Sequence, residues 1–329
     1  MNQSALSILR LLNDGQYWSG ESLEKKLFCK RAKILNSLKD IDSYGIKIVN
    51  TRGLGFRWIN PISYLNKNLI LGYNSIDLRN FNITLFDTLD STNTFLLDNL
   101  KNGVVDNRCI PVVATEYQTN GRGRAGRLWY SGFGDSLTFS FGWRFDKGVS
   151  ALSGISLIIG IAIIRVLRTF SITCASIKWP NDILVGNKKL AGILIELRGE
   201  ICGPSYAVIG VGFNYKLSDN IKSIINQKTT DFLSISDVYF DRNQILSALL
   251  TEFQNILPVF VNHGFAYFKK EWISYHAFER HQVSLILPND SVIVGTVDGV
   301  KEDGSICLMT SSGRKSYHVG DISIRLNSL

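Results

Sequence analysis

The sequence predicts an α+β protein built from several domains, and three observations support that prediction. A chain of 329 residues, with 45% hydrophobic and 19% charged residues, is long enough and apolar enough for two or three globular domains. Its apolar residues first repeat at helical spacing, then alternate between strand and helix patterns, and finally mark only short strands. We therefore expect domains over residues 1–60, 79–276 and 277–329, with a linker over 61–78.

The N-terminal sixty residues predict three helices followed by a β-hairpin. Helices are expected over residues 5–13, 21–27 and 30–44, with Ser19 as the N-cap of the second and Gly45 at the end of the third. The helical period predicts that the third helix buries four apolar side chains, namely Ile34, Leu35, Leu38 and Ile41.

Strands expected over 46–49 and 56–59 enclose a turn at 51–55, and this order of elements is that of a winged helix-turn-helix. In such a module the third helix enters the major groove of DNA, and the hairpin tip reaches the backbone or the minor groove. The side chains predicted to contact DNA are Lys33, Asn36 and Ser37 on the helix and Arg52 on the hairpin. The alternative is a small helical docking domain.

The distribution of charge favours the DNA interpretation. Residues 1–60 contain ten Lys or Arg and five Asp or Glu, a net charge of +5 out of +8 for the whole chain. A compact basic module at one end of a chain indicates a polyanionic partner for that module. A soluble basic domain without such a partner has the same composition, so charge alone does not decide.

The central segment predicts a mixed sheet covered by helices. Two long helices are expected, a strongly apolar one over 151–170 and another over 240–276 with a break at Pro258, and a shorter helix follows the capping sequence at 90–93. Strands are expected over 83–89, 110–115, 136–145, 177–185, 189–197 and 206–215. The last fifty residues predict a small β-barrel, with strands over 283–287, 292–297, 306–310, 315–319 and 322–326.

Composition disfavours several classes of protein. The five cysteines are scattered, odd in number and without metal-ligand spacing, which argues for a reducing compartment and against disulfides or a zinc site. The four histidines show no metal spacing either. The chain opens without a signal-peptide pattern, and its most apolar run, 155–164, is too short to span a bilayer. We expect a cytoplasmic protein with no membrane partner.

The most informative segment is the glycine–arginine loop, residues 118–131, which reads Gln-Thr-Asn-Gly-Arg-Gly-Arg-Ala-Gly-Arg-Leu-Trp-Tyr-Ser. Its glycines allow a ligand to approach the backbone closely, and its arginines carry planar donor groups suited to carboxylates and phosphates. This composition predicts a loop that binds an anion and becomes ordered on contact with it. The loop also contains Gly-x-Gly-x-x-Gly, but no helix pattern follows, which disfavours a dinucleotide fold. A solvated loop or an RNA contact is the remaining alternative.

Four other segments of the central domain carry polar groups at strand ends. Residues 90–93 offer hydroxyl and amide groups suited to a neutral head group, and 178–182 turn at Pro-Asn-Asp. Residues 188–194 place Lys189 at the start of a buried strand, and 210–214 form a glycine-bearing strand end against which a flat ring could lie. Taken singly, the first is an N-cap, the second a β-turn and the third a solvated lysine.

Together these strings resemble the biotin protein ligases, and the resemblance covers nearly the whole chain. Gly-Arg-Gly-Arg-x-Gly-Arg-x-Trp-x-Ser, Lys-Trp-Pro-Asn-Asp and Lys-Leu-Ala-Gly-Ile-Leu occur here in the family's order and at its separations. The chain is most similar to the bifunctional class, which also represses the biotin operon. The resemblance implies an N-terminal winged helix-turn-helix, a central mixed α/β ligase domain like that of class II synthetases, and a C-terminal SH3-like β-barrel.

The resemblance implies a two-step reaction that uses biotin, ATP and Mg²⁺. The biotin carboxylate attacks the α-phosphate of ATP to give biotinyl-5′-AMP, and a lysine of biotin carboxyl carrier protein, part of acetyl-CoA carboxylase, then displaces AMP. Fixed cations at the carboxylate–phosphate junction favour such a transition state. The sequence identifies no Mg²⁺ ligand, although Asp182 is a candidate.

Transferred residue by residue, the resemblance implies three groups of site residues. The expected catalytic cations are Lys189, which would bridge carboxylate and phosphate, Arg122, and Arg124, which would shield the anhydride. Biotin is expected to contact Ser91, Thr92, Asn93, Gln118, Arg122, Gly123, Arg124 and Lys189. The nucleotide is expected to contact Arg127, Trp129, Asn181, Phe213 and Asn214.

The resemblance also implies a homodimer formed when biotinyl-AMP is bound. The ordered loop would complete a surface at the edge of a sheet, and the dimer would present two winged helices to operator DNA. Acceptor protein and a second ligase would compete for that surface. Two departures bear on this half of the function: Ala125 stands where many relatives carry Arg, and residues 29–32 differ at the start of the recognition helix.

Three alternatives stay open on the sequence alone. The first is a ligase whose N-terminal domain binds no operator, the second a ligand-sensing transcription factor without enzymatic activity, and the third a lipoate ligase. Lys189 beside an intact arginine loop argues against the second. The glycine–arginine loop and the N-terminal module favour biotin over lipoate.

Overall fold

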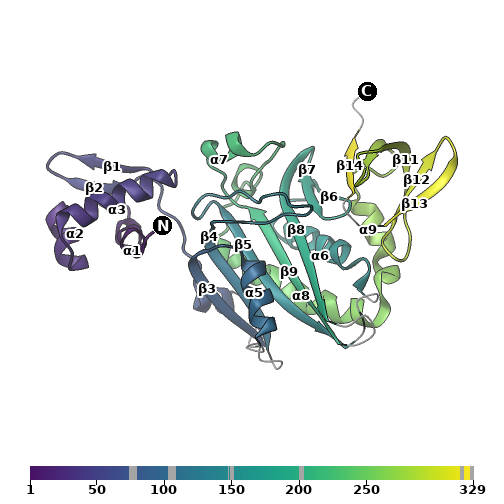
Figure 1. Cartoon of the computed structure of the whole chain (residues 1–329), viewed down its shortest axis with the longest axis horizontal. Helices are drawn as coiled ribbons and strands as arrows, with labels where there is room; N and C mark the ends of the chain where they lie inside the picture. The colour runs from purple at the N-terminus through teal and green to yellow at the C-terminus, as the bar shows by residue number, and fades with distance from the viewer. Residues whose placement is uncertain are drawn as a thin grey trace.

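The computed structural model describes residues 1–73, 80–102, 109–146, 148, 152–199, 204–318 and 322–326. Figure 1 shows an N-terminal region, a central sheet with its helices and a C-terminal sheet, which follow one another from left to right. Four sequence predictions fall partly or wholly outside the described residues: the boundary at 78–79, the first residue of the 151–170 helix, Cys202, and residue 319 of a predicted strand.

The N-terminal region consists of three helices and a two-stranded hairpin. Its elements are α1 (Gln3–Leu12), α2 (Gly20–Leu27), α3 (Arg31–Ser43), β1 (Ile48–Thr51) and β2 (Gly55–Trp58). Ser19 caps α2 by accepting a hydrogen bond from the amide of Ser22. Gly45 follows α3 with φ of +74°, the left-handed conformation expected where a helix stops. Apolar side chains from the helices and the hairpin form one buried cluster.

α3 does not bury the four residues predicted from its sequence. Ile34 and Ile41 are buried, but Leu35 is 42% exposed, whereas Ser37 is only 2% exposed. Position 37 lies three residues after Ile34 and four before Ile41, so helical geometry places it on their face. The prediction that Ser37 contacts DNA is therefore wrong, because a small polar residue occupies a core position.

The expected linker contains a helix. α4 (Lys67–Gly72) follows Asn66, whose side chain accepts hydrogen bonds from the amides of Asn68 and Leu69. Ile70 in this helix is fully buried. A six-residue helix with one buried side chain leaves no apolar period in the sequence, and for that reason the segment looks like a linker.

Hydrogen bonds from two sides hold residues 62–66 in place. Asn13, at the end of α1, exchanges two hydrogen bonds of 3.0 and 2.9 Å with the backbone of Ile62. On the other side a buried ion pair, Arg242–Glu116 at 2.6 Å, also hydrogen-bonds the backbone of residues 63 and 65. The segment between the N-terminal and central regions is therefore held in one conformation.

One residue of the central region belongs to the N-terminal core. Phe133 is 4% exposed, and its ring centroid lies 6.4 Å from that of Trp58 and 6.0 Å from that of Tyr64. Arg10 of α1 pairs with Asp87 of the central sheet at 2.5 Å. The two regions are thus joined by packed side chains as well as by the chain.

The central region is built on a seven-stranded sheet in the order β3-β4-β5-β9-β8-β7-β6. The β3–β4 pair is parallel and the other pairs are antiparallel. The strands are β3 (Phe81–Leu89), β4 (Ile110–Gln118), β5 (Ser136–Phe145), β6 (Ala175–Lys178), β7 (Asp182–Val185), β8 (Lys188–Gly199) and β9 (Ser205–Asn214). The single strand predicted over 177–185 is a hairpin, because the chain turns at Pro180 and Asn181.

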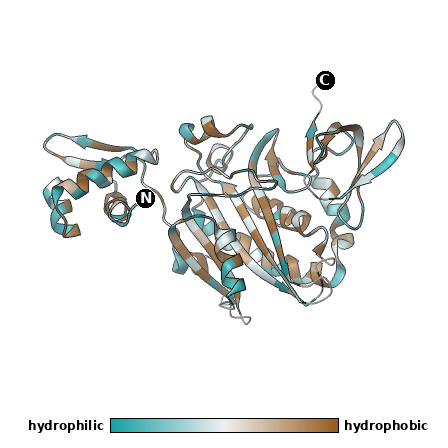
Figure 2. Ribbon diagram, viewed as in Figure 1, coloured by the Kyte–Doolittle hydropathy of each residue, from teal (hydrophilic) through white to brown (hydrophobic). Residues whose placement is uncertain are grey.

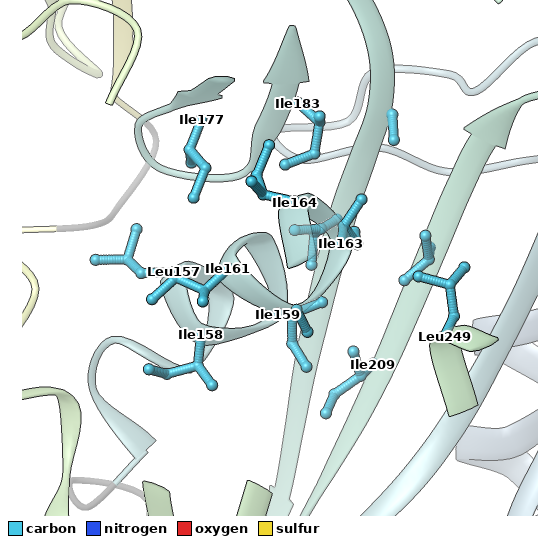
Figure 3. Packing of buried hydrophobic residues seen from close by; sticks show 14 of the residues in the cluster. Leu157, Ile158, Ile159, Ile161, Ile163, Ile164, Ile177, Ile183, Ile209 and Leu249 are labelled. Carbon is cyan, nitrogen blue, oxygen red and sulfur yellow. The ribbon is translucent and has the colours of Figure 1, made fainter. Parts of the chain in front are cut away.

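Helices cover both faces of this sheet. α5 (Thr92–Lys101) lies over β4, β5 and β9, while α6 (Ile155–Thr169) and α8 (Arg242–His263) lie on the other face. Figure 3 shows Ile177, Ile183, Ile209 and Leu249 around six labelled side chains of α6, namely Leu157, Ile158, Ile159, Ile161, Ile163 and Ile164. Figure 2 shows the same helix and strands in hydrophobic colours. The main core therefore lies between the sheet and α6 and α8.

α8 runs through Pro258 without interruption, so the predicted break is wrong. Ile256, Leu257 and Phe260 flank the proline and are buried, and this burial outweighs the hydrogen bond that proline removes. The helix ends instead before Gly264. Among the described residues α8 is the one helix long and apolar enough to cross a membrane, but half of its apolar window is buried inside the protein.

The C-terminal region is a five-stranded antiparallel sheet in the order β13-β12-β11-β10-β14. Its strands are β10 (Gln282–Ile286), β11 (Val292–Val300), β12 (Ile306–Thr310), β13 (Gly313–Tyr317) and β14 (Ser323–Leu326). Trp179 donates a hydrogen bond of 3.0 Å to the backbone oxygen of Gly304, which ties this sheet to the β6–β7 turn. Two short helices that the sequence did not predict separately are α7 (Asp219–Ile224) and α9 (Lys269–Tyr275).

Candidate functional site

A cavity of about 810 Å³ opens on the α5 side of the central sheet. Its walls come from the start of α5, the glycine–arginine loop, the β6–β7 turn, parts of β8 and β9, and β14 of the C-terminal sheet. Most residues predicted to bind ligands line it: Ser91, Thr92, Asn93, Gln118, Arg122, Gly123, Arg124, Arg127, Trp129, Asn181 and Lys189. Segments far apart in the sequence therefore meet around one space.

The glycine–arginine loop forms a small hairpin along one wall of this cavity. Arg122 pairs with Leu128 as an antiparallel bridge, and the Gly123 amide donates a 2.6 Å hydrogen bond to the backbone oxygen of Arg127. At the tip, Ala125 and the following glycine have φ of +52° and +70°, two successive left-handed residues as in a type I′ turn. The loop thus has internal hydrogen bonds that its composition did not predict.

Trp129 lies flat against the strands that form the cavity floor. A Cβ atom added at Gly212 of β9 would lie 2.4 Å from the Trp129 ring, and one added at Gly192 of β8 would lie 3.2 Å from it. The ammonium of Lys189 lies 5.6 Å from the centre of the same ring. Gly212 is therefore required for the close approach of the indole to the sheet, whereas a side chain at Gly192 would only press on the indole.

Replacing Gly212 by Ala is expected to lower the free energy of unfolding by about 1–3 kcal/mol, because the added methyl group overlaps the Trp129 ring. Urea denaturation followed by circular dichroism measures this change. Gly72→Ala is the matched control, since a Cβ at Gly72 meets no atom within 4 Å. Equal stability of the two variants would mean that the indole can move away from β9 without cost, and would contradict its tight packing against Gly212.

A group of cations surrounds a single carboxylate at one end of the cavity. The Lys189 ammonium lies 2.7 Å from Asp182, and that of Lys178 lies 3.9 Å from the other oxygen of the same carboxylate. Burial lowers the pKa of Lys178; Asp182 opposes this shift, and the charges of Lys189, Arg127 and Arg325 add to it. This end of the cavity therefore has an excess of positive charge and suits an anion.

Two of these cations were missed as site residues. Lys178 belongs to the Lys-Trp-Pro-Asn-Asp string, and its position beside Asp182 across the turn was the available signal. Arg325 comes from β14, in a region that the sequence places in a separate domain, and no local pattern connects it with the cavity. Arg124 extends from the hairpin to the side-chain oxygen of Asn181 at 3.0 Å, so the loop tip is held near the same end.

The other end of the cavity is lined by neutral polar groups. The side-chain oxygen of Gln118 accepts a 2.9 Å hydrogen bond from the Thr92 amide, which directs the NH₂ group of Gln118 to another partner. The Thr92 hydroxyl lies 2.6 Å from that of Ser140 and 3.2 Å from the Gln118 oxygen. Ser91, the N-cap of α5, lies beside them. This end suits an uncharged head group with a carbonyl acceptor.

Asn93 is fully engaged within the protein. Its side-chain oxygen accepts a 2.5 Å hydrogen bond from Ser140, and its NH₂ group donates to Glu196 at 2.8 Å. Glu196 also pairs with Arg122 at 2.6 Å, and neither Glu196 nor Ser140 was predicted from the sequence. Asn93 therefore holds its neighbours in position, and the guanidinium of Arg122 lies at the neutral end of the cavity.

Two residues predicted for the nucleotide side do not line the cavity. Phe213 is 1% exposed and packs against Phe232, because alternation along β9 turns it to the face opposite Gly210 and Gly212. Asn214 is 2% exposed and donates hydrogen bonds to the backbone oxygens of Lys189 and Thr230. The predicted ligand contacts of both side chains are thus wrong in this structure.

The other DNA-contact predictions fall on exposed residues. Lys33 and Asn36 are exposed on α3, and Arg52 is exposed in the turn between β1 and β2. No cluster of three or more His, Cys, Asp or Glu side chains suitable for a metal ion occurs within the described ranges.

Two family models match the chain. The Biotin/lipoate A/B protein ligase family matches residues 85–214, which include the walls formed by α5, the loop, β8 and β9. The Biotin protein ligase C terminal domain matches residues 281–325, which end at Arg325. The two matches together cover every part of the chain that lines the cavity except residues 225–227.

Similar proteins extend this likeness over between 64% and 98% of the chain. The Bifunctional ligase/repressor BirA of Escherichia coli (strain K12) is 34% identical over 324 residues, 98% of each chain. A Biotin--[acetyl-CoA-carboxylase] ligase of Mycobacterium tuberculosis is 29% identical over 64% of this chain and 77% of its own. The structure of a biotin protein ligase from Aquifex aeolicus in complex with biotin and ATP is similar at a TM-score of 0.63, with 26% identity, over 75% of this chain and 99% of that one.

Proposed function

This chain belongs to the biotin protein ligase family and is a biotin–protein ligase, and from that premise we propose that it makes biotinyl-5′-AMP and transfers biotin to a lysine of biotin carboxyl carrier protein of acetyl-CoA carboxylase. The observation that carries the proposal is the polarity of the cavity. A neutral end at Gln118 and Thr92 and a cationic end at Lys189 and Lys178 share one space of about 810 Å³. The ureido head of biotin is uncharged and suits the neutral end, whereas the carboxylate of biotin and the phosphates of ATP are negative and suit the cationic end.

The cationic end would promote the first step. A carboxylate oxygen of biotin attacks the α-phosphorus of ATP, the bond to the bridging oxygen breaks, and pyrophosphate leaves with the electron pair. Negative charge concentrates where carboxylate and phosphate meet, and the Lys189 ammonium is positioned to stabilise it. In the second step the acceptor amine attacks the anhydride carbonyl, AMP leaves with the electron pair of the C–O bond, and the amine loses a proton.

The neutral end would hold the ureido head of biotin. The NH₂ group of Gln118 is oriented by Thr92 and can donate to the ureido carbonyl, while the hydroxyls of Ser91 and Thr92 can accept from the ureido N–H groups. Gly123 lets the chain of biotin pass close to the loop backbone. Arg122 lies at this end, so its role would be to bind and position biotin rather than to catalyse.

The nucleotide would occupy the side of Arg127, Trp129 and Asn181. The indole of Trp129 offers a flat apolar surface for a purine, and Arg127 adds positive charge near the phosphates. Asn214 would act indirectly, because it holds the backbone of Lys189 at the start of β8. Phe213 would have only a packing role.

We expect Mg²⁺ to accompany ATP. Asp182 is the only carboxylate among the described residues that line the cavity. Protein sites for Mg²⁺ commonly use one or two carboxylates together with phosphate oxygens and water, so this single side chain fits such a role. Bound Mg²⁺ would neutralise phosphate charge in the first step.

The direct test is mass spectrometry of a biotin carboxyl carrier domain incubated with this chain, ATP, Mg²⁺ and biotin. We expect the acceptor to gain the mass of one biotin on one lysine, and omission of ATP to prevent the gain. An unmodified acceptor in the complete reaction, with the chain folded by circular dichroism, would refute the proposal.

Arg124→Gly is expected to release biotinyl-5′-AMP before transfer, because it removes the contact that holds the loop tip to Asn181. The released anhydride reacts with any exposed amine, so bystander lysines should become labelled. Peptide mapping of a mixture of acceptor and serum albumin measures the ratio of the two products. A ratio equal to that of the unaltered protein would contradict the shielding role.

The N-terminal region would serve transcription. We propose that residues 1–60 form a winged helix-turn-helix that binds biotin operator DNA through Lys33, Asn36 and Arg52, with a linker over 61–78. Residues 79–276 would form a class II synthetase-like catalytic domain, 277–329 an SH3-like barrel, and the chain would act in the cytoplasm as a homodimer when biotinyl-5′-AMP is bound.

Gel-shift titration on biotin-operon promoter DNA separates repressor and enzyme-only functions. We expect a shift that strengthens with biotin and ATP and weakens as salt increases, because phosphate contacts release counterions. Absence of a shift in an active ligase would leave the enzyme-only alternative.

A further inference from the structure

The neutral end of the cavity is organised around one carboxylate that the reaction itself does not require. Glu196 of β8 accepts a 2.8 Å hydrogen bond from Asn93 of α5 and pairs at 2.6 Å with Arg122 of the glycine–arginine loop, both through the same oxygen. Three elements distant in the sequence, α5, β8 and the loop, therefore meet at Glu196.

The hydrogen bonds at Glu196 continue through the predicted biotin contacts. Asn93 accepts a hydrogen bond from Ser140, Ser140 contacts the Thr92 hydroxyl, and the Thr92 amide orients Gln118. Because a carboxylate can only accept, it forces the NH₂ group of Asn93 toward itself and leaves the Asn93 oxygen for Ser140. The Glu196 carboxylate thus determines which group donates and which accepts in the hydrogen bonds between Asn93 and Ser140.

Glu196 also lies away from the cationic end of the cavity, where the reacting groups are expected. It shares the cavity face of β8 with Gly192 and Leu194. The Lys189 ammonium lies 3.0 Å from the position of a Cβ atom added at Gly192, four positions before Glu196, which corresponds to about 13 Å along an extended strand. The nearest cation to Glu196 is instead Arg122, with which it pairs at 2.6 Å. Its charge therefore acts locally, on Arg122 and Asn93.

From these contacts we infer that Glu196 is a positioning residue for biotin, which holds the stem of the glycine–arginine loop over the bound head group through its pair with Arg122. This inference rests on the proposed ligase reaction. Without the carboxylate, Arg122 loses its ion pair, so the loop stem is no longer held to β8. The hydrogen-bonded groups that are expected to contact biotin also lose their fixed orientation. Hydrogen bonds to charged groups contribute about 10- to 100-fold in an equilibrium constant.

The test compares E196Q with the intact chain in the first half-reaction. The KM for biotin should rise about tenfold or more, and adenylate made from tritiated biotin should dissociate about tenfold faster under a chase of unlabelled biotin. The KM for ATP should change by less than about twofold, since the nucleotide end is remote. E252Q is the matched control, because Glu252 also pairs with an arginine, Arg165 at 2.8 Å, at similar exposure but outside the cavity.

A double-mutant cycle with R122M tests whether Glu196 acts through Arg122. In the R122M background the effect of E196Q should fall below about threefold, since the partner is already gone. An unchanged biotin KM and release rate in E196Q, or an equally large effect in the R122M background, would overturn the inference while wild-type activity leaves the proposed function intact. A wild-type chain that forms no adenylate would instead refute both.

Discussion

Replacing Lys189 by Ala is expected to reduce biotin-dependent ATP–pyrophosphate exchange by about 10²–10³-fold, the effect typical of removing one group that stabilises transition-state charge, or about 2.7–4 kcal/mol. The ammonium of Lys189 is held at the cationic end of the cavity, 2.7 Å from Asp182 and over the Trp129 ring. Its side chain is only 16% exposed, so its charge is poorly screened by water.

The control for this prediction is Lys188→Ala, which removes an exposed lysine that does not line the cavity. That variant should keep exchange activity within about twofold. The fold of Lys189→Ala should be intact by circular dichroism, because Lys189 contributes no apolar core contact. Near-normal exchange in Lys189→Ala would remove Lys189 from the mechanism.

Replacing Arg242 by Ala is expected to lower the free energy of unfolding by about 3–5 kcal/mol, which is the cost of breaking a buried ion pair by removing one partner. Arg242 has no exposed surface, and its guanidinium hydrogen-bonds the backbone oxygens of Ser136 and Ser63 as well as Glu116. Without it, Glu116, which is 3% exposed, keeps a buried charge whose counterion is gone. Urea denaturation measures the loss.

Two comparisons sharpen this prediction. Arg280→Ala removes an arginine that is 75% exposed and pairs with Asp298 at 2.9 Å, so it should cost no more than about 1 kcal/mol. The double variant Arg242→Met with Glu116→Leu removes both charges and should recover part of the lost stability. A single Arg242→Ala variant as stable as Arg280→Ala would show that the pair is not a structural anchor.

The parts of the site that lie within one short string were predictable from the sequence. The order of elements around Ser91, the glycine–arginine loop and Lys189 follows from local caps, glycines and apolar runs, and these segments line the cavity. Phe213 and Asn214 were assigned by their place in a string, but strand alternation and a covering segment at Thr230 decide where their side chains lie.

Residues that act through tertiary contacts could not be found in the sequence. Glu196 looks like an ordinary exposed position of a long strand until Asn93 and Arg122 arrive beside it from elsewhere. Arg325 reaches the cavity only because the C-terminal sheet packs beside the β6–β7 turn. Pro258 and Ser37 were misassigned for a related reason, since core burial overrides local propensity and the small size of serine fits a packed helix face.

The place of Phe133 within the N-terminal core has a practical consequence for anyone who wishes to study the ligase alone. Deleting the first sixty residues would remove the side chains that pack against the Phe133 ring. The apolar surface exposed in this way contributes about 1.5–3 kcal/mol when it is buried. Such a fragment would have an exposed hydrophobic patch at Phe133, four residues after Trp129 in the sequence. If such a fragment aggregates or has a low kcat, the cause would be the exposed interface with the N-terminal region. Its kcat would then be lower than that of the full chain.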